Sequence, residues 1–191
     1  MNQNPSVSTR DHVLETAARL FFQNGYRSIG VDTISAEANI GKMTLYRHFD
    51  SKDDLIEAYL REANTKFWEW FDRSTSEANE PRAKLSAFFV ALQKQVVTPA
   101  CYGCPFLNVA TEYPSLDYPG HRVALEHKQA VLLRFRELAV QAGLRDPEVL
   151  ADQLFLLMDG AFMAVRMFGT RNPAVHLVEA AETLIAARAP Q

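Results

Sequence analysis

Basic and aromatic side chains gather between residues 42 and 52, on one side of a short predicted helix. Leu45 and Phe49 are four residues apart and define the opposite, apolar side. The charged groups of Lys42 and Arg47 can donate hydrogen bonds to O6 and N7 of guanine, and Thr44 offers a hydroxyl or a methyl group. The candidate DNA-contacting residues are Thr33, Lys42, Met43, Thr44, Tyr46, Arg47, His48 and Lys52.

A tight corner between two short helices would position this basic face. Residues 34–38 can close the first helix, and Asn39-Ile40-Gly41 breaks it because Asn and Gly tolerate left-handed backbone. A second helix of about two turns then covers residues 42–49. This layout is typical of a helix-turn-helix, whose second helix reads the major groove of DNA.

The pair Cys101-x-x-Cys104 is the other feature with possible chemistry. Zinc needs four protein ligands, or three and a water, and His121 and His127 lie beyond a Pro/Gly loop at no standard spacing. Two cysteines at this spacing can also close a disulfide and act as a thiol switch. We favour ordinary structural cysteines and predict neither a metal nor a cofactor, with the thiol switch as the alternative.

The composition is that of a globular protein without a bulk positive charge. The 191 residues are 48% hydrophobic and 23% charged, and the net charge is −3. Attraction to DNA must therefore come from a local face, and between residues 39 and 52 only Asp50 opposes Lys42, Arg47 and Lys52. No nucleophile–base motif, Gly-rich phosphate loop or metal constellation is present, so we do not expect an enzyme.

The ends and apolar runs of the chain indicate its compartment. The start, MNQNPSVST, lacks the basic residues and the apolar run of a signal peptide. The longest apolar stretch, residues 154–165, is interrupted by Asp159 and is too short to cross a bilayer. Two cysteines do not make a disulfide framework. We predict a cytoplasmic protein with no membrane partner.

Apolar periodicity predicts an all-α fold of about nine helices, and no strand-like alternation stands out. A Ser51–Asp54 capping box starts a long helix that reaches about Arg73 without Pro or Gly, and Asp146 is expected to cap a later helix. The expected helices cover residues 10–24, 31–38, 42–49, 51–73, 82–97, 105–113, 121–142, 147–168 and 173–187.

Residues 10–52 resemble the N-terminal domain of the TetR family of one-component bacterial transcriptional regulators. The resemblance rests on AARLFFQNGY, on V-D-x-I-x-x-x-A, and on T-L-Y-x-H-F followed by Ser-Lys, all in the right order and spacing. It covers about the first third of the chain. It implies that Tyr46, His48 and Lys52 hold phosphates, and that the long helix passes a signal between two coupled domains.

Three residues depart from the family pattern. Gly30 and Gly41 stand where the family usually has a hydroxyl residue before a helix, and Met43 replaces a small residue. The fold interpretation is unaffected, but the base contacts are left open. With the resemblance, we expect a flexible arm over residues 1–8, a three-helix helix-turn-helix DNA-binding domain over 9–55, and a helical effector-binding and dimerisation domain over 56–191.

The expected helix over residues 147–168 is apolar nearly all round, which indicates cover on several sides. We infer a second subunit, and the resemblance implies a homodimer built from helices at about 121–142 and 147–168. Asp152, Asp159 and Arg166 are spaced by seven and form a polar line along this helix. They predict either an interfacial salt bridge or, for Asp159 and Arg166, a polar contact in an effector pocket.

Aromatic residues of the second domain are candidates for the lining of such a pocket, although most must be core. The candidate ligand-binding residues are Phe67, Trp70, Phe71, Phe88, Phe106, Tyr113, Phe155, Asp159, Phe162 and Arg166.

Together these features predict a TetR-type regulator, by resemblance a repressor, that binds a palindromic DNA operator as a homodimer. A small, largely apolar effector would release it. The alternatives are a redox sensor that uses Cys101 and Cys104 and, from a different class, a helical adaptor that does not bind DNA.

Overall fold

Nine α-helices and one 3₁₀ turn build residues 8–190, the part of the chain that the computed structural model describes, and no strand occurs among them. The all-α prediction is confirmed. The predicted N-terminal arm lies outside the described residues except for Ser8. The Ser8 hydroxyl accepts the backbone N–H of Asp11 at 3.1 Å and so caps the first helix.

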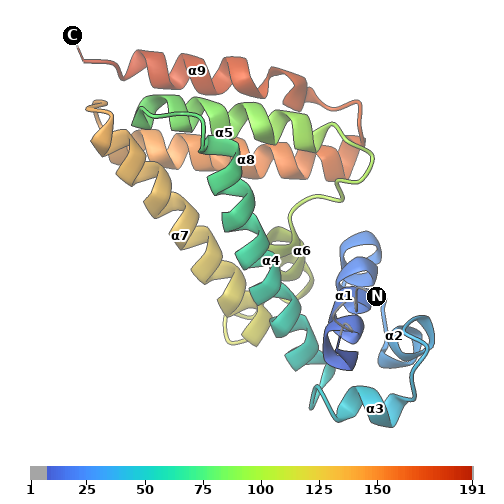
Figure 1. Cartoon of the computed structure of the whole chain (residues 1–191). Helices are drawn as coiled ribbons and strands as arrows, with labels where there is room; N and C mark the ends of the chain where they lie inside the picture. Colours follow the sequence, from blue (N-terminus) through green and yellow to red (C-terminus); the bar gives the residue numbers. More distant parts are fainter. Residues whose placement is uncertain (1–7, 191) are drawn as a thin grey trace, which may run out of the picture.

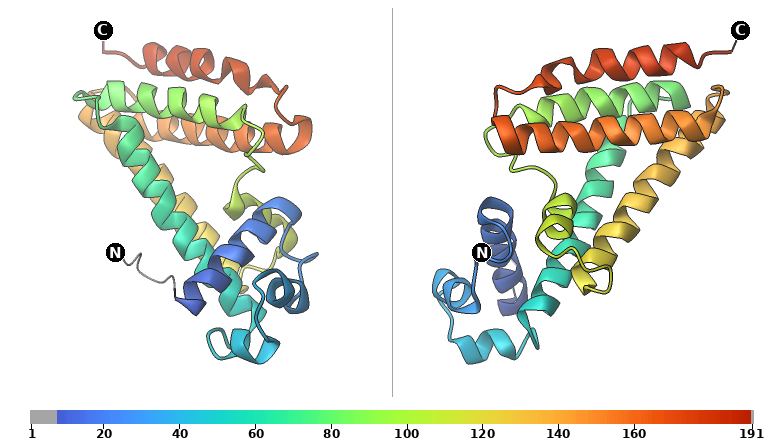
Figure 2. Two further views of the ribbon diagram at one scale, coloured as in Figure 1. Left: turned by 45° about the vertical axis from the view of Figure 1, so that its right-hand side comes forward. Right: turned by 180° about the vertical axis from the view of Figure 1, so that it is seen from behind.

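The helices form a small head and a larger bundle joined by one long helix (Figure 1). In both views of Figure 2 the head, α1–α3, lies below the bundle, and α4 rises from it. Helices α5, α8 and α9 run side by side, and α7 crosses them obliquely. The elements are α1 (Thr9–Asn24), α2 (Val31–Glu37), α3 (Lys42–Tyr46), α4 (Lys52–Thr75), α5 (Pro81–Val96), α6 (Pro105–Glu112), α7 (Pro119–Gln141), α8 (Pro147–Phe168), η1 (Pro173–His176) and α9 (Leu177–Ala187).

The long helix α4 begins at the expected capping box. The Ser51 hydroxyl accepts the N–H of Asp54 at 3.1 Å and donates to its carboxylate at 2.8 Å. The helix continues two residues beyond the expected Arg73. It packs against α1 of the head and against α5, α6 and α7 of the bundle. Buried side chains lie near both of its ends, Leu55 and Ile56 in the first turn and Phe71 in the sixth. The helix therefore belongs to both parts of the molecule.

The recognition helix is shorter than predicted. The α-helix ends at Tyr46 rather than Phe49, but the chain stays wound because the N–H of Phe49 donates to the carbonyl of Leu45 at 3.1 Å. Asn39 takes the left-handed conformation expected of the corner, with φ of 52°. The corner and both flanking helices thus follow the prediction, with a tighter last turn.

Two boundaries near the C-terminus differ from the prediction. Asp146 does not cap α8 with its side chain, because its backbone is left-handed (φ 47°) rather than extended and its carboxylate pairs with Arg188. The final helix is divided because the side chain of Asn172 accepts the N–H of Ala174 at 2.9 Å and starts a 3₁₀ turn. Helix α9 begins only at Leu177.

The short helix α6 ties the head to the bundle. The carboxylate of Glu112 accepts the backbone N–H groups of Tyr26 (3.0 Å) and Arg27 (2.7 Å), just after α1 ends. At the other end of α6 the hydroxyl of Tyr26 donates to the carbonyl of Pro105 at 2.9 Å. Gly25 has φ of 86°, and a Cβ there would lie 2.8 Å from Oε1 of Glu112. The positive φ favours glycine, and a side chain there would also displace the Glu112 carboxylate from these hydrogen bonds.

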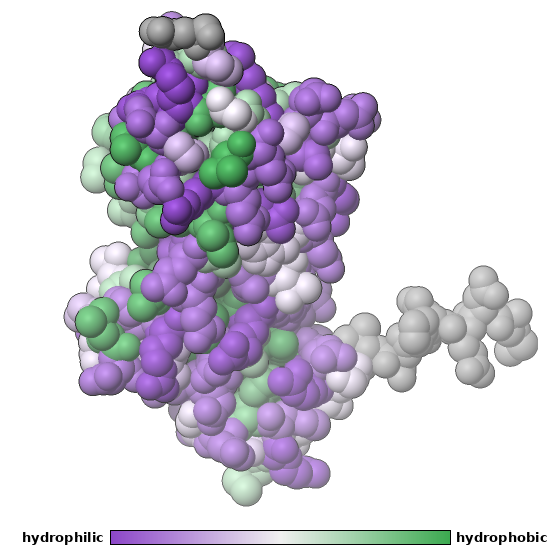
Figure 3. Space-filling view, turned by 90° about the vertical axis from the view of Figure 1, so that its left-hand side faces the viewer, coloured by the Kyte–Doolittle hydropathy of each residue, from purple (hydrophilic) through white to green (hydrophobic). Residues whose placement is uncertain are grey.

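The surface is mostly polar. The face shown in Figure 3 is largely hydrophilic, with small hydrophobic patches distributed among polar residues over both its upper and lower parts. Within residues 8–190, no helix combines the length and the apolar character needed to cross a membrane.

Candidate DNA interface and internal cavity

The recognition helix α3 turns its polar side away from the protein. Leu45 and Phe49 are buried against the head, and the guanidinium carbon of Arg10 lies 4.9 Å from the centre of the Phe49 ring. Thr44 is half-buried. The remaining predicted contact residues of this segment are exposed, and they are Lys42, Met43, Tyr46, Arg47 and His48. Because the apolar side holds the helix in place, this outer face is free to meet a duplex.

Two of the predicted cationic contact residues, Lys42 and Lys52, are not simply free charges in solvent. Lys42 donates to Asp32 of α2 at 2.7 Å, and this hydrogen bond raises the pKa of the Lys42 ammonium. Lys52 is half-buried at the start of α4, and its pKa is lowered because burial disfavours its charged form. Thr33 is exposed on α2. Arg47 and Lys42 therefore differ as candidates for base contacts, since the Lys42 ammonium already pairs with Asp32.

Met43 is 75% exposed at the tip of the recognition helix. A long apolar side chain in this position can contact the methyl group of thymine, which is part of the major-groove pattern. Gly41, just before the helix, has space for a side chain, because a Cβ there would meet only the Thr44 hydroxyl oxygen at 3.9 Å. A hydroxyl residue would therefore fit at this position, and crowding does not explain why glycine replaces it.

A cavity of about 420 Å³ opens among α1, α4, α5, α6, α7 and α8. A volume of this size suits a small organic ligand. Four of the predicted ligand-binding residues line it, namely Phe67 and Trp70 of α4, Phe106 of α6, and Phe162 of α8.

The other predicted ligand-binding residues lie elsewhere. Phe71 and Phe88 are buried core residues with ring centres 5.2 Å apart, because the end of α4 packs on α5. Tyr113 stacks on Tyr118 at 4.1 Å outside the cavity. Phe155 is also absent from the cavity wall.

Of the two charged candidates, neither lines the large cavity. Arg166 lines a separate, more polar pocket beside the α8 end, where it donates to the carbonyl of Tyr102 at 3.4 Å. Asp159 pairs with Lys128, which does line the cavity. The Lys128 and Asp159 side chains are only 13% and 19% exposed. Burial raises the pKa of Asp159, while the neighbouring Lys128 acts in the opposite direction. The predicted polar contact of Asp159 is thus made, in the free protein, to Lys128.

Sequence reasoning missed several residues of the cavity wall. Phe22, Tyr59 and Met158 are apolar wall residues, and Arg19, Glu62 and Lys66 add charged groups. Their helices come together only in the folded chain, so no local signal identifies them. His127 is different, because it takes an inner position between Val123 and Val131 in the buried stripe of α7. A lone polar residue in an apolar stripe could have been recognised as unusual.

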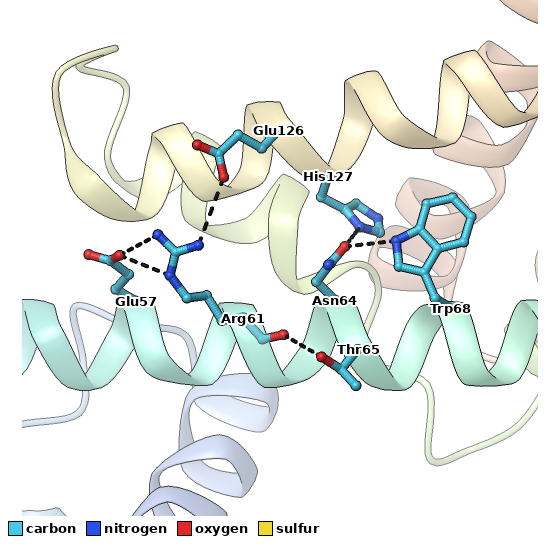
Figure 4. Close-up of polar contacts among 7 residues, drawn as sticks. All are labelled: Glu57, Arg61, Asn64, Thr65, Trp68, Glu126 and His127. Carbon is cyan, nitrogen blue, oxygen red and sulfur yellow. Dashed lines mark hydrogen bonds and ion pairs between the residues drawn. The ribbon is translucent and has the colours of Figure 1, made fainter.

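His127 is held in one orientation between α4 and α7 (Figure 4). Its Nδ1 lies 2.8 Å from Oδ1 of Asn64, and the same oxygen accepts the indole N–H of Trp68 at 3.1 Å. Its ring stacks on Phe106, with centres 3.7 Å apart. Burial, and secondarily the charge of Lys128, lowers the pKa of His127 to about 3. The imidazole is therefore neutral at physiological pH.

The two cysteines are poor candidates for a thiol switch. Both are free, Cys104 is buried on the cavity wall, and Cys101 is half-buried. Burial raises the pKa of both thiols, which leaves little of the nucleophilic thiolate at neutral pH. Among residues 8–190, no three side chains of His, Cys, Asp or Glu cluster as metal ligands would.

Comparison with known proteins gives consistent matches. Residues 13–59 match the model of bacterial regulatory proteins of the tetR family. SCO4454, a TetR-family transcriptional regulator from Streptomyces coelicolor, is 32% identical in sequence, and its crystal structure superposes with a TM-score of 0.90 over 95% of this chain and 96% of that one.

More distant relatives cover the same length. The HTH-type transcriptional repressor DhaR of a Mycobacterium species is 26% identical, over 86% of this chain and 85% of DhaR. The reduced form of NemR from E. coli is 19% identical, with a TM-score of 0.81 over 96% of this chain and all of NemR, and shares the fold.

The depressed pKa of His127 predicts a pH-dependent stability. Below pH 6.5 the unfolded chain binds a proton at this residue and the folded chain does not, so the free energy of unfolding falls by up to about 1.4 kcal/mol per pH unit until about pH 3. Urea unfolding at pH 7.5 and pH 5.5 measures this. The wild type should lose about 1.4 kcal/mol more than His127→Phe over that interval. His176→Phe, at an exposed histidine, should behave like the wild type, and equal losses in all three proteins would contradict the assignment.

Proposed function

Because this chain belongs to the TetR family of bacterial transcriptional regulators, which are not enzymes, we propose that it is a homodimeric repressor released from a palindromic operator by a small, largely apolar effector. The observation that carries the proposal is the double role of α4. It packs against α1 of the head, and its middle, from Tyr59 to Trp70, forms one wall of the cavity. A ligand in the cavity therefore touches the helix that orients the head.

Operator binding would use the outer face of α3. Arg47 is the first candidate for a guanine contact, and Lys42 could join it by leaving or sharing Asp32. Thr44 and Met43 would meet base edges, the latter through a thymine methyl. Phosphate contacts are proposed for Thr33, Tyr46, His48 and Lys52. Because the bacterial chromosome lies in the cytoplasm, the proposal also assigns the protein to that compartment.

A homodimer through α7 and α8 is supported by apolar side chains left exposed on these helices. On α8, Leu156 (68% exposed), Met163 and Met167 lie on one side with Gly160. On α7, Leu125, Leu133 and Val140 are exposed. Burying them against a second copy would satisfy the hydrophobic effect, and a two-fold axis would present two recognition helices to a palindrome.

Repression and effector release rest on different observations. The name of DhaR supports repression over activation, since that relative is a repressor. The aromatic lining supports an apolar effector, because such a cavity gains most from burying apolar surface. An adaptor that never binds DNA does not fit a regulator family, so no second function is proposed.

Arg47→Ala is expected to weaken specific DNA binding without affecting folding. A contact from arginine to a base is worth about 1–3 kcal/mol, and the dimer would lose two, so affinity should fall at least about tenfold. The operator is first obtained by selection from a random DNA pool, and affinity is then measured by fluorescence anisotropy at fixed salt. Arg82→Ala, at an exposed arginine of α5, is the matched control. Unchanged affinity in Arg47→Ala would remove Arg47 from the interface.

Leu156→Glu is expected to convert the dimer to a monomer, because it puts a charge into the centre of the apolar face. Analytical ultracentrifugation measures the mass. Leu116→Glu, at an equally exposed leucine (70%) in the loop before α7, should leave the dimer intact. Gly160→Leu gives a second test, since a Cβ at Gly160 meets no atom within 4 Å in the single chain. A dimeric Leu156→Glu protein would place the interface elsewhere.

Neutral aromatic compounds that raise the melting temperature are expected to release the operator. A ligand at one hundred times its Kd stabilises the folded protein by about 2.7 kcal/mol. Ala63→Phe should fill part of the cavity, so that operator affinity is kept while melting shift and release are lost. Ala83→Phe, on the exposed side of α5, should respond like the wild type. If a broad panel neither shifts melting nor releases DNA, the effector part of the proposal is wrong.

A further inference from the structure

The hydrogen bonds of His127 define which of its ring nitrogens carries the proton. The indole N–H of Trp68 can only donate, so the Asn64 atom that it contacts at 3.1 Å is the oxygen. The same oxygen lies 2.8 Å from Nδ1 of His127. Nδ1 must therefore carry a proton, and in the neutral imidazole Nε2 is then an acceptor without one. Figure 4 shows the oxygen between the two rings.

Nε2 is an acceptor without a donor. His127 is only 3% exposed and lines the cavity, and no group within residues 8–190 donates to its Nε2. The low pKa keeps this nitrogen unprotonated, so it does not become a donor at neutral pH. A ligand that donates to Nε2 makes a hydrogen bond that no described residue supplies, and it does so in a poorly solvated site.

The charges on the wall disfavour an ionised ligand. Lys128 is already neutralised by Asp159, and both side chains are largely buried. A carboxylate brought to Lys128 would also approach Asp159, and two like charges would share a poorly solvated site. An ammonium would meet Lys128 in the same way. The other charged wall residues are paired as well, Arg19 with Glu37 and Lys66 with Glu62. The wall therefore suits a neutral molecule.

The apolar part of the wall suits a flat ring. Phe22, Phe67, Trp70, Phe106 and Phe162 contribute aromatic side chains from four helices. Ring-on-ring packing of this kind adds to the free energy gained by burying apolar surface.

We infer that the effector is a neutral aromatic compound with one hydrogen-bond donor, most simply a phenolic hydroxyl, which donates to Nε2 of His127. This inference rests on the proposed function, in which the cavity is the effector site. It adds a ligand class and a recognition residue, and it makes His127 a binding residue rather than a core histidine.

The test compares probes of matched shape. Binding of 2-naphthol, 2-methylnaphthalene and 2-naphthoate is measured by isothermal titration at pH 7, where 2-naphthol keeps its proton. The first two differ by a hydroxyl in place of a methyl group. One hydrogen bond of about 0.5–1.5 kcal/mol corresponds to about a two- to tenfold change. The affinity ratio of 2-naphthol to 2-methylnaphthalene should therefore fall by about that factor in His127→Phe, which keeps an aromatic ring on Phe106. The carboxylate probe should bind most weakly.

Two further variants complete the experiment. His176→Phe, at the exposed histidine, should keep the wild-type ratio. Asn64→Leu removes the acceptor that fixes the tautomer while His127 remains, so the ratio should fall there too, and this variant replaces His127→Phe if that protein does not fold.

The outcomes separate this inference from the proposed function. An unchanged ratio in His127→Phe and Asn64→Leu, or tight binding of 2-naphthoate, overturns the inference while effector release through the cavity stands. The inference also falls if 2-naphthol does not bind although other apolar compounds release the operator. If no compound of any kind releases the operator, the effector part of the proposed function fails, and the inference falls with it.

Discussion

The carboxylate of Glu112 makes the contact on which the coupling of the two parts depends. It accepts two backbone N–H groups in the turn that follows α1, and such charge-assisted bonds are stronger than neutral ones. The first residues of the same helix, Cys104 to Phe106, form part of the cavity wall. Helix α6 has only eight residues, so its contact with the cavity and its contact with the head lie close together along the chain. The cavity and the end of α1 are thereby mechanically linked.

Helix α4 gives a second, independent link. Its middle lines the cavity, while its first turn is tied to the bundle because the Tyr118 hydroxyl donates to Asp53 at 2.8 Å. The head is therefore held by α4 and α6 together, and the cavity lies between these two supports. In the proposed function, a ligand that separated them would change the orientation of the head, to which a dimer with fixed half-site spacing is sensitive.

The sequence predicted the head better than the cavity, for a physical reason. Helix spacing, the Ser51–Asp54 box and the Asn39 corner are local, so they can be read along the chain, and the structure follows them. The cavity is built by six helices that meet only after folding, and aromatic content alone could not separate wall residues such as Phe67 from core residues such as Phe88. The partner of Asp159 was missed for the same reason, because Lys128 is 31 residues away on α7.

Helix α8 is apolar nearly all round because it has two apolar faces, which lie on opposite sides of the helix. At 3.6 residues per turn, Met158 and Phe162 point to one side of the helix and line the cavity, while Leu156, Gly160 and Met163 point to the opposite, exposed side. The apolar stripe that indicated a second subunit is thus distinct from the one that forms the cavity. One helix thickness separates the two surfaces. If the exposed side is the dimer interface, the partner subunit holds α8 on the side opposite the cavity. A ligand in the cavity then cannot displace α8 outward. The displacement that the ligand causes would instead be taken up by α4 and α6, which contact the DNA-binding head.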